Sequence, residues 1–259
     1  MRLEYEIDLE PGRVSIRSGG MAEFINSGDR KLSPEKLRIR ILDLIHAEIA
    51  NEMAAAGEEY SSDKIEERSL AAIDSMIDPD ISGPMRHIVV KAIHAAGDFA
   101  IAPLIRYSDG FFKSMLAKLK EGCTIICDSE MVRAGIYSRP VLERNRVVCY
   151  LNDVRSKEMA DVNGITRSAA GIRIAMQDHR NSVIVIGNAP TALLEAMRMI
   201  EENGWYDIPI VGIPVGFINA SKAKEGLVSS HIEYISVEGH RGGSPIAASI
   251  VNGFGRFLA

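Results

Sequence analysis

The chain has 259 residues, of which 46% are hydrophobic and 25% charged, and its formal net charge is −5 at pH 7. This composition is typical of a soluble globular protein with room for one domain and an extension, and the net negative charge argues against nucleic acid as a partner. The longest apolar runs are too short to cross a bilayer and the acidic start is unlike a signal peptide, so we expect a cytoplasmic protein that does not bind membranes.

Residues 1–59 are predicted to form an N-terminal extension, made of a short strand and an amphipathic helix. Apolar residues alternate from Leu3 to Leu9, which favours a strand that ends at Pro11. Ser33 is a suitable helix cap, and the apolar residues that follow it recur at helical spacing as far as Met53. We expect this helix to pack against the body of the protein or against a partner subunit.

The rest of the chain changes from helices to alternating strands and helices. Residues 65–97 contain two helical stretches separated near 79–84, and a third helix is predicted at 109–119. Five short apolar runs rich in β-branched residues follow, at 124–127, 147–151, 183–186, 208–213 and 234–237. This alternation predicts an α/β fold, a three-layer sandwich with a five-stranded parallel sheet of the flavodoxin-like type.

The three cysteines, Cys123, Cys127 and Cys149, are predicted to be small buried side chains in a reducing compartment. Their spacing does not match a zinc site, and we expect no metal.

A small or polar segment follows each predicted strand, and several of these segments are rich in glycine. Because ligands of parallel sheets bind at the carboxyl ends of the strands, the segments are expected to line one pocket. Their glycines, the helix N-termini behind them, and the guanidinium groups of Arg167 and Arg241 favour an anionic ligand. A single segment of this kind is an ordinary turn, and only the combination indicates a site. No segment has a nucleotide-binding glycine pattern.

His94 is the second candidate, at the end of a predicted helix that spans residues 87–96. His87, Lys91 and His94 share one face of that helix by their spacing. An imidazole can exchange a proton near neutral pH, although a lone histidine among alanines is more often structural. His240 lies within a candidate loop, where its role stays open.

Six segments together resemble the precorrin-8X methylmutase family, also called the cobalt-precorrin-8 methylmutase family, in sequence and in order. They are IHAAGD at 93–98, CDSEMV at 127–132, GITRSAA at 164–170, IGNAPTAL at 186–193, PVGF at 214–217 and RGGS at 241–244. The resemblance covers residues 60–259, which we therefore expect to be the methylmutase domain.

The resemblance implies an enzyme of cobalamin biosynthesis that needs no cofactor. Its substrate would be a tetrapyrrole-derived corrinoid with several carboxylates, and its reaction the shift of a methyl group from C-11 to C-12, giving hydrogenobyrinate or cobyrinate. The resemblance also implies a homodimer with the active site near the subunit interface. It makes His94 the catalytic residue, and a protonated imidazole in such a position contributes about 10²–10⁴-fold to a rate. The expected substrate-binding residues are Ser69, Arg167, Ser168, Gly187, Asn188, Thr191, Gly216, Arg241, Gly242, Gly243 and Ser244.

The chain departs from the family pattern at two places. Its first 59 residues have no counterpart, and His240 stands where the family usually has arginine, so one carboxylate contact is expected to differ. Two other functions remain open at this point: a non-catalytic corrinoid carrier on the same scaffold, and a flavin or nucleotide enzyme, which the missing phosphate-binding patterns disfavour.

Overall fold

The structure is a computed structural model that describes residues 6–10, 13–18, 21–26 and 62–258. The chain divides into two compact units, Met1–Ser62 and Asp63–Ala259.

The N-terminal unit contains three antiparallel strands in the order β1-β2-β3, namely β1 (Glu6–Glu10), β2 (Arg13–Ser18) and β3 (Met21–Asn26). The sequence analysis predicted only the first of them. In β2, Val14 and Ile16 alternate with polar residues over only six positions, which is a weak signal for a strand. The helix predicted after Ser33 lies outside the described residues.

The second unit is built on one six-stranded sheet, in the order β4-β9-β8-β7-β5-β6. Its strands are β4 (Ile105–Tyr107), β5 (Thr124–Cys127), β6 (Arg146–Cys149), β7 (Ser182–Ile186), β8 (Ile210–Gly212) and β9 (Tyr234–Val237). The five predicted runs are all strands, and they pair in parallel. The prediction of five strands in the sheet was wrong, because β4 adds a sixth, antiparallel to β9 at the edge. A three-residue strand is too short to show a period in the sequence.

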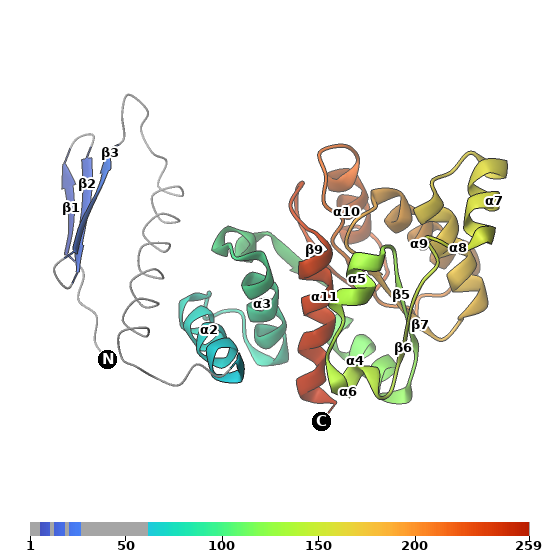
Figure 1. Cartoon of the computed structure of the whole chain (residues 1–259), viewed down its shortest axis with the longest axis horizontal. Helices are drawn as coiled ribbons and strands as arrows, with labels where there is room; N and C mark the ends of the chain where they lie inside the picture. Colours follow the sequence, from blue (N-terminus) through green and yellow to red (C-terminus); the bar gives the residue numbers. More distant parts are fainter. Residues whose placement is uncertain (1–5, 11–12, 19–20, 27–61, 259) are drawn as a thin grey trace. The chain divides into compact units, whose positions relative to one another are not determined.

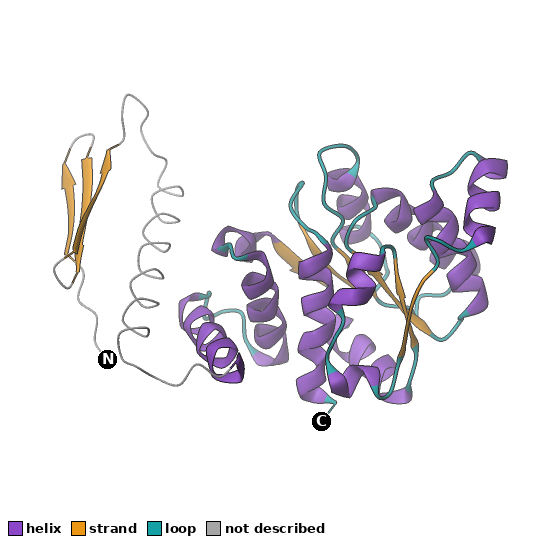
Figure 2. Cartoon of the chain, in the orientation of Figure 1, coloured by secondary structure: helices purple, strands orange, loops and turns teal. Residues whose placement is uncertain are grey.

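Helices connect these strands and cover the sheet (Figures 1 and 2). The α-helices are α2 (Ser62–Met76), α3 (Gly83–Ala96), α4 (Phe111–Glu121), α5 (Glu130–Gly135), α6 (Arg139–Leu142), α7 (Val154–Asn163), α8 (Arg167–Asp178), α9 (Pro190–Asn203), α10 (Ala220–Val228) and α11 (Ser244–Gly253). Two 3₁₀ helices, η1 (Phe99–Leu104) and η2 (Phe254–Phe257), complete the unit. No helix among the described residues is both long enough and apolar enough to cross a membrane.

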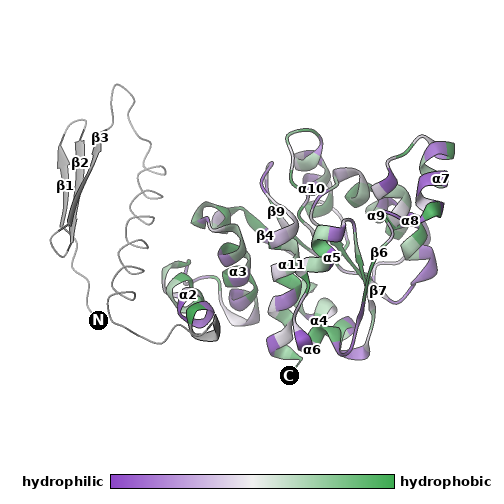
Figure 3. Ribbon diagram, in the orientation of Figure 1, coloured by the Kyte–Doolittle hydropathy of each residue, from purple (hydrophilic) through white to green (hydrophobic). Residues whose placement is uncertain are grey.

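The core has two halves, one on each face of the sheet. Side chains alternate along a strand, so Ile125 packs into one half and Ile126 into the other. Helices α3, α4, α5 and α11 supply the first half, and α8, α9 and α10 supply the second. Figure 3 shows the hydrophobic sheet between helices that carry their hydrophilic residues outward. Because helices pack on both faces of the sheet, the ends of each strand have fixed positions, and so have the starts of the loops that follow them.

The cysteines are unpaired thiols that lie on or next to the sheet. Cys123 and Cys127 are buried and Cys149 is half-buried. Burial raises the pKa of Cys123 to about 12 and that of Cys149 to about 11, and it raises the pKa of Cys127 as well. The thiols therefore stay protonated near neutral pH and act as small apolar side chains, as the sequence predicts.

Candidate active site

The loops after four of the five parallel strands, β5, β7, β8 and β9, meet at the carboxyl edge of the sheet. The backbone N–H of Gly216, after β8, donates to the carbonyl of His240, after β9, at 3.1 Å. The N–H of Gly243 donates to the carbonyl of Ile213 at 3.0 Å. Hydrogen bonds between these loops join them into one continuous rim, here called the loop rim. It consists of the segments at 128–131, 187–191, 214–217 and 239–244.

Asp128 organises the turn after β7. Its carboxylate accepts backbone N–H bonds from Gly187 at 3.0 Å, Asn188 at 2.9 Å and Ala189 at 2.6 Å. Burial raises the pKa of Asp128, and the three backbone donors oppose that effect. The sequence analysis expected the glycines and helix N-termini of these segments to favour an anionic ligand. In this turn the backbone N–H groups already bind a carboxylate of the protein itself.

Two glycines of the loop rim allow backbones to approach closely. A Cβ on Gly187 would lie 2.7 Å from the Cα of Ser244, and a Cβ on Gly242 would lie 2.5 Å from the carbonyl oxygen of Ile213. Gly242 also has a φ of 156°. Both residues therefore have a structural reason to be glycine, independent of any contact with a ligand.

The starts of α8 and α9 lie side by side at the same edge. The hydroxyls of Thr166 and Thr191 are 2.7 Å apart, and Thr166 also caps α8 by accepting the N–H of Ala169 at 3.2 Å. Arg167, the first residue of α8, is exposed, and Ser168 is half-buried. The geometry leaves the Arg167 guanidinium accessible from solvent.

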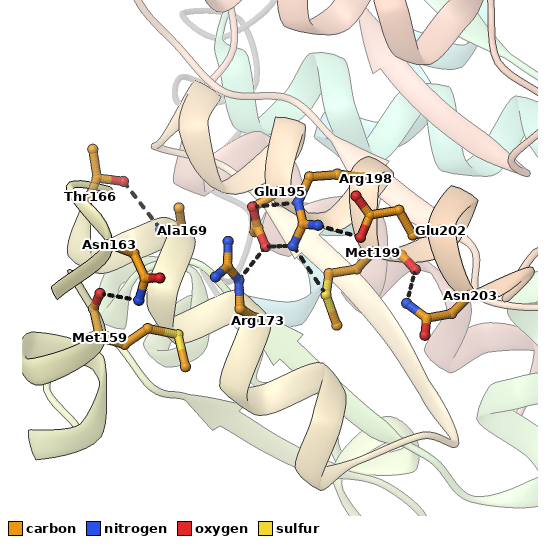
Figure 4. Close-up of polar contacts among 10 residues, drawn as sticks. All are labelled: Met159, Asn163, Thr166, Ala169, Arg173, Glu195, Arg198, Met199, Glu202 and Asn203. Atoms are coloured by element: carbon orange, nitrogen blue, oxygen red, sulfur yellow. Dashed lines mark hydrogen bonds and ion pairs between the residues drawn. The ribbon is translucent and has the colours of Figure 1, made fainter.

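A buried glutamate fastens α8 to α9 (Figure 4). The Oε1 of Glu195 accepts hydrogen bonds of 2.6 Å from both Arg173 and Arg198. Burial alone would raise the pKa of Glu195, but the hydrogen bonds from Arg198 and Arg173 lower it overall. The ionised Glu195 with its two guanidinium partners holds α8 against α9. It therefore also fixes Arg167, at the start of α8, relative to Thr191, at the start of α9.

His94 lies in the last turn of α3, which ends where Gly97 adopts a left-handed conformation. Its ring is exposed, and Nδ1 is 3.0 Å from the Oγ of Ser69 on α2. No described residue forms a hydrogen bond with Nε2. The predicted catalytic histidine and a predicted substrate-binding serine therefore touch, with one ring nitrogen left for a ligand.

Lys91 lies on the same helix as His94 but is not accessible from solvent. Its side chain is buried, and its Nζ forms an ion pair with Glu66 of α2. The hydrogen bond from Lys91 lowers the pKa of Glu66. This second contact between α2 and α3 lies one helical turn from the pair formed by Ser69 and His94, and it fixes the spacing of the two helices.

An ion pair connects the loop rim to the helix that carries His94. The Nη1 of Arg241 is 2.7 Å from Oδ2 of Asp98, four residues after His94, and Oδ1 of Asp98 accepts the N–H of Ala100 at 2.8 Å. The buried Lys224 donates to the carbonyl of Arg241 at 2.6 Å. Sequence reasoning quoted Asp98 and Asp128 within motifs without giving them a role. It missed Lys224, which has no signal beyond an ordinary helical position.

The loop after β8 ends in exposed apolar side chains. Phe217 is 91% exposed, and its ring stacks on that of His240 with centroids 5.0 Å apart and an angle of 22° between planes. Ile218, the next residue, is also exposed. A flat apolar surface thus stands beside Arg241.

The structure therefore brings the predicted residues into two connected groups. His94 and Ser69 form one, and the loop rim with Arg241, Gly242, Gly243 and Ser244 forms the other, joined through Asp98. Arg167 and Thr191 lie at the start of neighbouring helices, and Asn188 has an exposed side chain. Within the part of the chain that the structure describes, no three His, Cys, Asp or Glu side chains gather as metal ligands would.

Comparison with known proteins gives one consistent result. The family model for precorrin-8X methylmutase matches residues 64–256. The precorrin-8X methylmutase of Pseudomonas aeruginosa is 37% identical over 174 residues, covering 66% of this chain and 84% of that protein. The cobalt-precorrin-8 methylmutase of Salmonella typhimurium is 34% identical over 196 residues, covering 73% and 91%. The crystal structure of precorrin-8x methyl mutase from Thermus thermophilus matches with a TM-score of 0.68 at 29% identity, covering 76% of this chain and 96% of that one.

Proposed function

The chain belongs to the precorrin-8X methylmutase family, and on that premise we propose that it shifts a methyl group from C-11 to C-12 of precorrin-8X or cobalt-precorrin-8. The product is hydrogenobyrinate or cobyrinate. The reaction is an isomerisation within one molecule in cobalamin biosynthesis. One observation carries the assignment of the site: His94, which is hydrogen-bonded to Ser69 and whose Nε2 bonds to none of the described residues, is connected through Asp98 to a rim that bears Arg241.

His94 is the catalytic residue in this proposal. A methyl shift around a conjugated ring needs no nucleophile, and it is favoured when one electronic state of the ring is stabilised. An imidazolium that donates from Nε2 to a ring nitrogen would stabilise the rearranging ring, and the contact of Nδ1 with Ser69 holds the imidazole in place for that donation. Ser69 is then primarily a positioning residue.

Side chains rather than backbone amides bind the carboxylates of the substrate. Asp128 already occupies the amides of Gly187 and Asn188, so Arg167 and Arg241 are the principal anion-binding groups. Ser168 and Thr191 lie at helix starts near Arg167, where hydroxyls add hydrogen bonds. Ser244 is buried with its hydroxyl 3.4 Å from that of Ser129, and it contributes through its place at the start of α11 beside the loop rim. Gly187, Gly216, Gly242 and Gly243 contribute by shaping the loop rim, since Gly187 and Gly242 let its backbone segments approach one another closely.

The finer features of the fold and assembly are part of the same proposal. In chain order, the five parallel strands have the arrangement 2-1-3-4-5, which supports a flavodoxin-like fold. A methylmutase domain at 60–259 is supported by the family match at 64–256 and by the compact unit from Asp63. The homodimer rests on the family resemblance, and three unpaired cysteines fit a cytoplasmic location.

Turnover by a His94→Ala variant tests the function. We expect the wild-type protein to convert precorrin-8X, supplied metal-free and cobalt-loaded, to a product with an altered absorption spectrum. The variant should lose about 10²–10⁴-fold in kcat and still bind hydrogenobyrinate, because its carboxylate contacts remain. His231→Ala, at an exposed histidine outside the site, is the matched control.

The same experiment separates the enzyme from a carrier. A carrier would bind the macrocycle with equal affinity before and after the His94 substitution and would show no turnover in the wild type. Absence of conversion by wild-type protein with both forms of the substrate would overturn the proposed function.

A further inference from the structure

A cavity of about 500 Å³ lies between α2, α3 and η2, within the second unit. This volume falls in the range of small-molecule sites. Apolar side chains, among them Leu70, Val90 and Phe257, form much of its lining. No motif that identified the family includes these residues.

The lining of this α2–α3 cavity carries two carboxylates and two guanidinium groups, and one of the guanidinium groups has no ion-pair partner among the described residues. Asp74 is neutralised by Arg86, whose Nε lies 2.7 Å from Oδ1 of Asp74. Glu67, the other carboxylate of the lining, is exposed. Arg256 forms no ion pair with any residue in the described ranges, and it lies in the lining with His87.

The pKa of His87 shows the effect of the positive charge on Arg256. Burial lowers its pKa, and the nearby guanidinium of Arg256 lowers it further. Its ring packs edge-on against Phe257, with centroids 5.8 Å apart. An anion placed between Arg256 and His87 would be attracted by the first and would receive a hydrogen bond from the second.

The α2–α3 cavity is close to the catalytic pair along the helices. Leu70 follows Ser69 on α2, and Val90 precedes His94 by about one turn on α3. His87 is seven residues before His94, which corresponds to about 10 Å along the helix. A ring held over His94 could therefore extend a side arm into the cavity.

We propose that the α2–α3 cavity binds a carboxylate-bearing side arm of the corrinoid substrate, with Arg256 as the group that binds the carboxylate. The apolar lining takes the aliphatic part of the arm, and the guanidinium takes its charged end. This inference rests on the proposed function, because it takes the macrocycle as the ligand.

Arg256→Gln tests the proposal in the full chain. The dissociation constant of hydrogenobyrinate, measured by absorbance titration, should rise about 10- to 150-fold, since a hydrogen bond to a charged group contributes about 1.5–3 kcal/mol and each 1.4 kcal/mol is a factor of ten. KM should rise with it while kcat changes less. Arg256→Lys should recover part of the affinity. Arg139→Gln on α6, at a side chain that is 88% exposed, is the matched control and should bind like the wild type.

A second ligand shows whether a loss of affinity in Arg256→Gln comes from the lost ion pair or from a misfolded protein. Hydrogenobyrinate with its carboxylates esterified should bind both proteins more weakly, because Arg167 and Arg241 lose their ion pairs as well. The ratio of its dissociation constants for Arg256→Gln and wild type should nevertheless fall to about one, because the ester cannot pair with Arg256 either. Equal binding of the free acid by both proteins would overturn the proposal while leaving the methylmutase function intact. Tight binding that depends on Arg256, without any turnover by the wild type, would instead support the cavity and remove the proposed function.

Discussion

The Oγ of Ser69 lies 3.0 Å from Nδ1 of His94, and this contact joins two helices at the point where the chemistry is expected. A serine hydroxyl can donate to a neutral ring nitrogen or accept from a protonated one. The contact can therefore persist while the imidazole gains or loses a proton, and the ring keeps its orientation throughout.

Ser69→Ala should lower kcat about two- to tenfold, because one hydrogen bond contributes about 0.5–1.5 kcal/mol. The dissociation constant of hydrogenobyrinate should change little, since the hydroxyl positions His94 instead of the ligand. Stopped-flow absorbance and equilibrium titration measure the two quantities. Ser75→Ala is the control on the same helix, because Ser75 donates only to the carbonyl of Ala72. A variant with weakened binding and unchanged kcat would show instead that Ser69 contacts the substrate directly.

Phe217→Ala should weaken product binding without changing thermal stability. A side chain that is 91% exposed contributes little to folding, whereas aromatic stacking on a ligand contributes about 0.5–1.5 kcal/mol. We therefore expect the dissociation constant to rise about two- to tenfold at constant Tm. Val162→Ala, at an 84% exposed side chain on α7, controls for loss of exposed apolar surface. If both variants bind alike, the stacked surface of Phe217 and His240 does not contact the macrocycle.

Gly187→Ala should destabilise the fold by about 1–3 kcal/mol. Its new methyl group would lie 2.7 Å from the Cα of Ser244, a backbone atom that cannot move without shifting the start of α11. Urea unfolding measures the change. The comparison variant is Gly226→Ala on α10, where the methyl group meets Met197 at 3.5 Å, and alanine should stabilise the helix by about 0.5–1 kcal/mol. Equal stabilities for the two variants would contradict the close approach.

Lys224 gives stability a pH dependence in the alkaline range. Its side chain is 1% exposed, and burial lowers its pKa from 10.5 to about 8. Between these two values the unfolded chain binds more protons than the folded protein, so the free energy of unfolding rises with pH. The gap of about 2.5 between the pKa values corresponds to about 3 kcal/mol over the whole range.

Lys224→Met removes this contribution. The unfolding free energy of the wild type relative to the variant should be constant below pH 8 and should rise from pH 8 to about 10.5. Urea unfolding at intervals of one pH unit provides the measurement. Lys222→Met, at an exposed position of the same helix, should give a difference that does not vary with pH. A constant difference for Lys224→Met would show that Lys224 is not held in an unfavourable charged state.

The parallel strands could be predicted because each contains a short, continuous apolar run, and four of the five lie inside the sheet, where these runs are buried. The edge strand β4 could not, since three residues carry no period. His94 could be selected from its motif, but its partner contacts depend on distant parts of the chain. Asp98 and Arg241 are 143 positions apart, and Asp128 and Gly187 are 59 apart. Sequence spacing alone does not place such pairs together, so the contacts of Asp98 and Asp128 could not be predicted.

Asp128 gives the turn after β7 an internal counter-ion, and this leaves recognition of the ligand to the ends of long side chains. Guanidinium groups on such side chains reach the outline of a macrocycle and can adjust to small changes in its pucker. A protein built in this way selects a ligand by the spacing of the negative charges around its periphery.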